Sequence, residues 1–273
     1  MRCLAAVVLL LFLLAPTVSA QPAEPGGYSI RASLGFATQD LGDVNDDIVD
    51  DAAMWRPLSS SLDWDDQFGE ATPFGLEFGY QYSERWSWAF GFTWHKSTVE
   101  HSAQLDYVDP ESFTTVTGEV TSDYRLKLLD LYATAMFWVP RASGLHIGAQ
   151  LGFALGGLDF KETYDLTGSD GSFLDLEGDG EGHASGLSAG AYAGYELALT
   201  PHWTISARGG YLYCNLGEMD GRIHLHGADN TGPIDQTLAG HMSNNAGEPM
   251  DFDFSGARVS GAVTYRFRWS GEF

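Results

Sequence analysis

Cysteine, basic residues and long apolar runs are all scarce in this sequence of 273 residues. Only two cysteines occur, and because Cys3 lies in the N-terminal segment, Cys214 has no partner for an internal disulfide. A small disulfide-stapled domain is therefore excluded. After residue 20, no stretch has the eighteen or so consecutive apolar residues of a transmembrane helix. The net charge of −23 disfavours nucleic acid as a partner.

Residues 1–20 have the organisation of a cleaved secretory signal. Arg2 precedes the apolar run LAAVVLLLFLL, and the segment ends in the small residues TVSA. We therefore expect a signal peptide at 1–20, a short N-terminal lead at 21–27, and one domain at 28–273.

Glycine and aromatic residues are abundant, and they alternate. In RWSWAFGFTWHKS (85–97), large aromatic side chains stand at every second position, with small or polar residues between them. Period-two alternation over about ten residues indicates a β-strand. Eight segments follow this pattern: 28–37, 73–82, 85–97, 125–139, 145–156, 187–199, 203–213 and 257–269. The segment 125–139 is the least regular, because placing Leu129 and Leu131 on the apolar face sends Trp138 to the polar face.

Short and long connections alternate strictly between these segments. The short ones are 83–85, 140–144 and 200–202, and the long ones are 38–72, 98–124, 157–185 and 216–254. We predict an all-β fold, an eight-stranded antiparallel transmembrane β-barrel with four long external loops and three short periplasmic turns. The aromatic face then meets lipid and the small polar face points into a narrow lumen. Trp86 and Trp203 near the short turns, and Trp94 and Tyr211 near the long loops, form two aromatic girdles.

In this pattern, and in the ending VTYRFRWSGEF, the sequence resembles the small outer-membrane β-barrels of the OmpA/OmpX type. The resemblance implies an integral protein of the bacterial outer membrane, surrounded by lipid and lipopolysaccharide and inserted by the barrel assembly machinery. It also implies that Tyr265, Phe267, Trp269 and Phe273 form the assembly signal. Because the chain ends at Phe273, we expect no periplasmic peptidoglycan-binding domain.

Acidic residues gather in the predicted external loops, which hold 31 of the 37. They can be a solvated surface or a site for divalent cations. Asp43, Asn45 and Asp47 match the first three oxygen positions of a calcium loop, but Ile48 replaces its glycine and Met54 its glutamate. We expect no cofactor other than weakly bound divalent cations.

Charged and polar side chains also share the inward face of the predicted strands. They are expected to pair, because an unpaired buried charge is costly. The predicted lumen charge network comprises Arg31, Glu77, His95, Asp130, His146, Glu196, Arg208, Arg258 and Arg266. An eight-stranded barrel is just wide enough for side chains to fill, which favours a salt-bridged plug over a gated narrow pore.

No catalytic motif fixes the geometry of an active site. His183, Ser185 and Ser188 lie close together in sequence without a recognisable arrangement, and His224 and His226 can share a metal ion only with a third ligand. We predict a non-enzymatic barrel protein that presents acidic surface loops for envelope integrity, adhesion or interaction. A narrow porin-like channel for small solutes is the alternative, and an outer-membrane enzyme comes third. The sequence identifies no external ligand.

Overall fold

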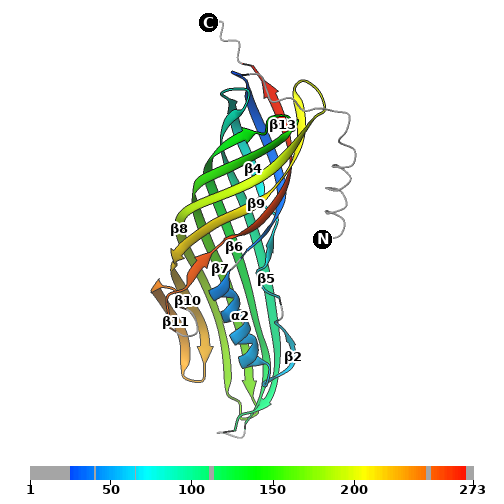
Figure 1. The fold of residues 1–273 in the computed structure, drawn as a ribbon. Helices are drawn as coiled ribbons and strands as arrows, with labels where there is room; N and C mark the ends of the chain where they lie inside the picture. The colour runs from blue at the N-terminus through cyan, green and yellow to red at the C-terminus, as the bar shows by residue number, and fades with distance from the viewer. Residues whose placement is uncertain (1–24, 40, 65, 111–113, 244–246, 269–273) are drawn as a thin grey trace.

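Eight antiparallel strands close into a ring in the computed structural model, which describes residues 25–268 apart from 40, 65, 111–113 and 244–246 (Figure 1). In ring order they are β1 (Tyr28–Thr38), β4 (Phe74–Gln81), β5 (Trp86–Val108), β6 (Thr115–Trp138), β7 (Leu145–Gly168), β8 (Phe173–Ala198), β9 (Trp203–Glu218) and β13 (Gly256–Phe267). β1 pairs with β4 on one side and with β13 on the other. The barrel therefore leaves no open edge, as lipid requires. This confirms the predicted fold class, while the signal segment 1–20 lies outside the described residues.

The two faces of the ring differ as the alternation predicts. Phe90, Leu151 and Leu187 are 68%, 71% and 75% exposed on the outside, whereas the charged side chains of the inward positions are largely buried. The irregular fourth segment has the predicted register, because Asp130 and Trp138 are buried and Leu131 is exposed. The exposed apolar band is the surface that contacts lipid.

The three short connections are tight turns at one end of the barrel, the upper end in Figure 1. In the β6–β7 turn, Gly144 has φ +84°, and a Cβ there would lie 2.3 Å from the backbone oxygen of Glu196. Only glycine fits both the backbone angle and the close approach. This turn therefore depends on a residue that the sequence pattern alone does not single out.

The strands continue far beyond the lipid band, and here the predicted loops are wrong. The segments 98–124 and 157–185 are mostly strand, because β5 runs unbroken to Val108 and β8 begins at Phe173. A membrane crossing needs about 9–11 residues, whereas β5 to β8 have 23 to 26. The extra length forms an external sheet.

The apolar face changes sides where the external sheet begins. On β6, Leu129 and Leu131 face outward to lipid, whereas Leu126 and Leu128 face inward and are almost fully buried. The adjacent pair Leu128–Leu129 marks the change. On the external side of this pair, the outward positions of the same strand are charged, as at Lys127. The medium outside has become water, so the apolar residues turn inward.

The remaining elements cover or extend this external sheet (Figure 1). They are α2 (Gly42–Trp55), β2 (Ser59–Asp63), β3 (Glu70–Ala71), β10 (Asp220–Asp229), β11 (Gly232–His241) and β12 (Asp251–Asp253). Val44, Ile48 and Ala52 recur every four residues on α2 and are buried in the core formed with the inner face of the sheet. The β10–β11 hairpin pairs with the external part of β8, which extends beyond its pairing with β9. The protein is therefore a membrane barrel that carries a packed external part.

Candidate functional site

Five charged side chains form a continuous chain of ion pairs across the lumen. Arg31 pairs with Glu196 and lies 3.6 Å from Glu77, measured from Nη1 to Oε2. Arg208 Nη1 donates to Glu77 Oε1 at 2.7 Å, and Arg266 Nη2 donates to Glu196 Oε2 at 2.5 Å. The order is Arg266–Glu196–Arg31–Glu77–Arg208, so each carboxylate lies between two guanidinium groups. Five different strands supply these residues, and the pairs cross-link the barrel.

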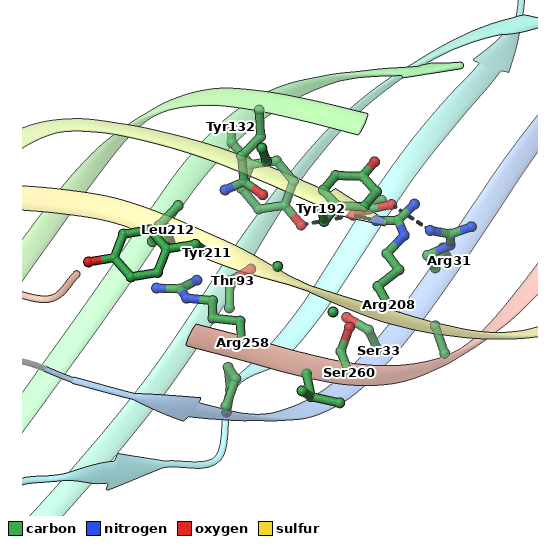
Figure 2. Close-up of a pocket in the computed structure, with 18 residues that line it drawn as sticks. Arg31, Ser33, Thr93, Tyr132, Tyr192, Arg208, Tyr211, Leu212, Arg258 and Ser260 are labelled. Carbon is green, nitrogen blue, oxygen red and sulfur yellow. Dashed lines mark hydrogen bonds and ion pairs between the residues drawn. The ribbon is translucent and has the colours of Figure 1, made fainter. Parts of the chain in front are cut away.

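Aromatic side chains complete this network. Tyr132 donates to Glu77 at 3.1 Å, and the guanidinium of Arg208 stacks over Tyr192 at 4.5 Å (Figure 2). His146 is fully buried and packs against the rings of Trp138 and Tyr192. Cation–π contacts of this kind stabilise an arginine held away from water. His146 therefore contributes packing and forms no ion pair with another described residue.

Asp130 and Arg258 lie one step closer to the external end. Asp130 accepts from Ser188 at 2.6 Å and from Gln150 at 3.3 Å. Arg258, Arg31 and Arg208 line a cavity of about 80 Å³, which Figure 2 shows between the strands. A cavity of that size holds a few water molecules.

An apolar layer lies between this network and the external end. Leu128, Leu212, Leu216 and Phe254 point inward, and each is at most 5% exposed. The ring of His95 packs 6.0 Å from that of Phe254 and contacts Gln39. The predicted network residue His95 thus belongs to this layer. Two layers therefore follow each other along the lumen, first the ion pairs and then the packed side chains.

The calcium-loop interpretation of residues 43–47 is wrong in its geometry. The segment lies in the first turns of α2, where side chains two residues apart point in different directions. Asn45 exchanges hydrogen bonds with the backbone of Phe68, and Asp43 accepts from the backbone of Asp251. Asp43, Asn45 and Asp47 therefore do not converge as loop ligands.

The aromatic positions of the expected assembly signal are described only in part. Tyr265 and Phe267 lie on β13 with their rings stacked at 6.0 Å. Trp269 and Phe273 lie outside the described residues.

The outward face of the external sheet has charges arranged by height above the lipid. Lys96 lies opposite Lys127, one step above the outward Trp94 and Leu129. In the next row Arg125 lies opposite Asp159, and Arg222 opposite Glu181, with 2.7 Å between Arg222 Nε and Glu181 Oε1. The rows farther from lipid are mainly acidic, with Glu119, Asp165, Asp175, Glu177 and Asp235. On β5 and β6 the outward charge thus changes from basic to mainly acidic with distance from the membrane.

This arrangement was missed from sequence because it depends on the pairing of the strand extensions. Lys127 and Asp159 form an ion pair on neighbouring strands, although they lie 32 residues apart in the chain. Lys161 likewise pairs with Glu177, and its hydrogen bond lowers the pKa of the Glu177 carboxyl. Period-two alternation with charged outward positions in 98–124 and 157–185 was the available signal.

A model of the family described as "Outer membrane protein beta-barrel domain" matches residues 6–267. Among solved structures, OprG of Pseudomonas aeruginosa is 14% identical with a TM-score of 0.41, and the match covers 91% of this chain and 99% of that one. Ail of Yersinia pestis, solved with the heparin analogue sucrose octasulfate, is 12% identical with a TM-score of 0.41, covering 89% and 99%. Neisserial surface protein A is 14% identical with a TM-score of 0.41, covering 89% and 97%. No curated protein sequence matches the chain.

In the described part of the chain, no helix is long and apolar enough to span a membrane.

Proposed function

The chain belongs to the outer membrane protein beta-barrel domain family and is an integral protein of the bacterial outer membrane, and from this premise we propose that it is a non-conducting, non-enzymatic surface protein. Its barrel anchors the external sheet, and the sheet presents an acidic surface for interaction outside the cell. The basic row nearest the lipid contacts the phosphates of lipopolysaccharide.

The two layers of inward side chains, the ion pairs and the packed apolar residues, are the observation that supports this proposal. The ion-pair chain is held by carboxylates that are 6% exposed at Glu77 and 1% exposed at Glu196. Toward the external end, the layer of Leu212 and Phe254 adds closely packed apolar side chains, and its polar groups His95 and Gln39 are buried against each other. A pore needs a continuous water-filled path, whereas the inward residues of this lumen pack against one another and form ion pairs.

The charge order on the outward face supports the role at the surface. Lys96 and Lys127 stand where the outward side chains change from apolar to charged, at the level expected for lipid head groups. Lysine and arginine bind phosphate through charge-assisted hydrogen bonds. The acidic rows beyond them avoid the anionic membrane surface and face the medium.

Planar-bilayer recording of the purified protein tests the closed lumen. We expect no steady conductance from the wild-type barrel or from Glu77→Ala, because the apolar layer still fills the lumen, and measurable current from the double variant Glu77→Ala, Phe254→Ala, which removes a side chain from each layer. Asp159→Ala, which removes an exposed carboxylate outside the barrel, serves as the control and should stay silent. Large, steady current through the wild type would contradict the proposal.

Binding of lipopolysaccharide tests the basic row. The double variant Lys96→Gln, Lys127→Gln should bind lipopolysaccharide micelles several-fold more weakly than the wild type, with a smaller dependence on salt. The matched double variant Lys161→Gln, Arg56→Gln removes two positive charges elsewhere and should bind like the wild type. Equal loss in both double variants would indicate a general charge effect and contradict the assignment.

A narrow channel is the second candidate, and the cavity of about 80 Å³ beside Arg258 favours it. Water can occupy this cavity beside the ion pairs of the lumen. Current that appears in Phe254→Ala alone, with Glu77 intact, would assign the gate to the apolar layer and favour the channel.

A further inference from the structure

Four side chains of the type that transition metals prefer lie together on the outward face of β8 and β10. In the antiparallel register, His224 lies opposite Asp179 and His226 lies opposite Glu177. Residues two apart on one strand share a face, so the two carboxylates and the two imidazoles form one cluster. We call Glu177, Asp179, His224 and His226 the β8–β10 cluster.

The ligand atoms are already close to coordination distance. One ligand atom each from Glu177, Asp179 and His226 lies within 4.8 Å of the other two. Around a tetrahedral zinc ion, ligand atoms at about 2.0–2.2 Å from the metal lie about 3.4 Å from each other. Small rotations of exposed side chains close that difference, and no backbone movement is required.

His224 is placed to provide a fourth ligand. Its ring stacks on that of His226 with centroids 5.4 Å apart, and its Nδ1 lies 3.0 Å from the hydroxyl of Thr237 on β11. A hydrogen bond at one ring nitrogen orients the ring, as at many metal sites. Nε2 lies 3.8 Å from Asp235 Oδ1 and reaches the metal by a rotation of the exposed ring. The Nδ1 atom of His226 is buried and has no hydrogen-bond partner within the described part of the chain. Its Nε2 lies 3.7 Å from Glu177.

A lysine occupies part of this position in the structure. Lys161 on β7 forms an ion pair with Glu177 and lies opposite Asp179 in the strand register. Its ammonium partly neutralises the two carboxylates, as a dication would do more completely. Metal binding therefore displaces this ammonium, and the lysine lowers the affinity of the cluster.

We propose that the β8–β10 cluster is a binding site for one divalent transition-metal ion, with zinc as the best fit. Two imidazoles with two carboxylates suit zinc, copper or nickel, whereas calcium and magnesium prefer all-oxygen sites. The ligands come from two separate hairpins, β7–β8 and β10–β11. A bound ion therefore joins the β10–β11 hairpin to the wall of the external sheet.

Isothermal titration of tag-free, metal-stripped protein in detergent micelles with zinc chloride tests this site. We expect one saturable site per chain, with affinity at least tenfold weaker in His226→Ala and in Glu177→Gln. The matched control is His183→Ala, which removes an outward histidine of β8 outside the cluster and should leave binding unchanged. Cobalt should give the visible absorption of a tetrahedral site in the wild type, and this band should disappear in His226→Ala.

The lysine gives a second, opposite test. Lys161→Met should bind zinc several-fold more tightly, because the competing ammonium is gone. The absence of saturable binding in the wild type, equal binding in His226→Ala, or calcium binding as tight as zinc would each overturn the proposal. Zinc binding found only in Lys161→Met would overturn it for the natural chain. Far-ultraviolet circular dichroism of each variant verifies that the barrel is folded.

Discussion

The same strands obey opposite rules in the membrane and outside it. The membrane part is called here the lower half and the external part the upper half, although Figure 1 shows the external part at the bottom. In the lower half of β6, the outward Leu131 is 47% exposed and the inward Asp130 is fully buried. In the upper half, the inward Leu126 is fully buried and the outward Arg125 is exposed. The backbone is continuous across this change, and only the surrounding medium differs. The comparison teaches that alternation defines a strand, whereas the solvent on each side decides which face is apolar.

The interiors of the two halves differ in the same sense. The lower interior holds ion pairs between arginines and carboxylates, and the upper interior holds an apolar core to which α2 contributes Val44 and Ile48. A polar interior specifies which groups must pair, whereas an apolar interior specifies shape and volume. Substitutions should therefore fail for different reasons in the two halves.

Removal of one lumen carboxylate should have the largest effect. Glu77→Ala leaves Arg31 and Arg208 without their shared partner, and breaking a buried pair in this way typically costs about 3–5 kcal/mol. Urea unfolding of the protein in lipid vesicles measures this loss. The exposed Asp159→Ala is the comparison, and equal destabilisation by both would show that the lumen is wet and screened.

A cavity in the upper core should come next. Leu128→Ala removes a side chain that is 1% exposed, and such truncations cost about 2–5 kcal/mol. Leu129→Ala, one residue along, should cost less because lipid chains fill the space that it leaves. The difference between these neighbours, measured by the same unfolding experiment, locates the change of face. A larger loss for Leu129→Ala would place that change elsewhere.

Charges introduced into the lipid-facing band should follow. Phe90→Arg and Val263→Arg each put a cation near the middle of the bilayer, at a cost of about 2–4 kcal/mol. Ser87→Ala and Ser260→Ala change the inward face of the same strands and should have little effect. Tolerance of arginine at both outward positions, judged by folding yield and unfolding free energy, would contradict the membrane assignment of the lower half.

The smallest effect is expected on the outward face of the upper half. Lys127→Gln breaks an exposed ion pair with Asp159, and such pairs contribute about 0–1 kcal/mol. Lys127→Leu should also leave stability nearly unchanged, although it continues the apolar stripe of the lower half upward. A decrease of more than about 1 kcal/mol in the unfolding free energy of Lys127→Gln would indicate that this pair contributes more than an exposed ion pair usually does.

The lower half could be predicted from sequence because lipid imposes one rule on every strand. The register of the fourth strand followed from placing Leu129, Leu131 and the alternate residues up to Val139 on the apolar face. The external sheet was missed because the rule was applied to a region where water had replaced lipid. Its acidic outward positions and its inward glycines, such as Gly178 and Gly180, were interpreted as loops. The partners in the lumen were also out of reach, since Arg31 on β1 meets Glu196 on β8 only after β13 and β9 have closed the ring between these two strands.

Because the strands are unbroken, the external part moves rigidly with the barrel, like the arm of a lever. From Trp94 to Val108, β5 continues for 14 residues beyond the upper girdle, about 46 Å of extended chain at about 3.3 Å per residue. With no flexible joint along β5, a 10° tilt of the barrel moves the outer end of such an arm by about 8 Å. Force applied to the outer end is likewise transmitted as torque to the girdle tryptophans. The local thickness of the bilayer, which sets the tilt, therefore sets the direction in which the acidic surface points.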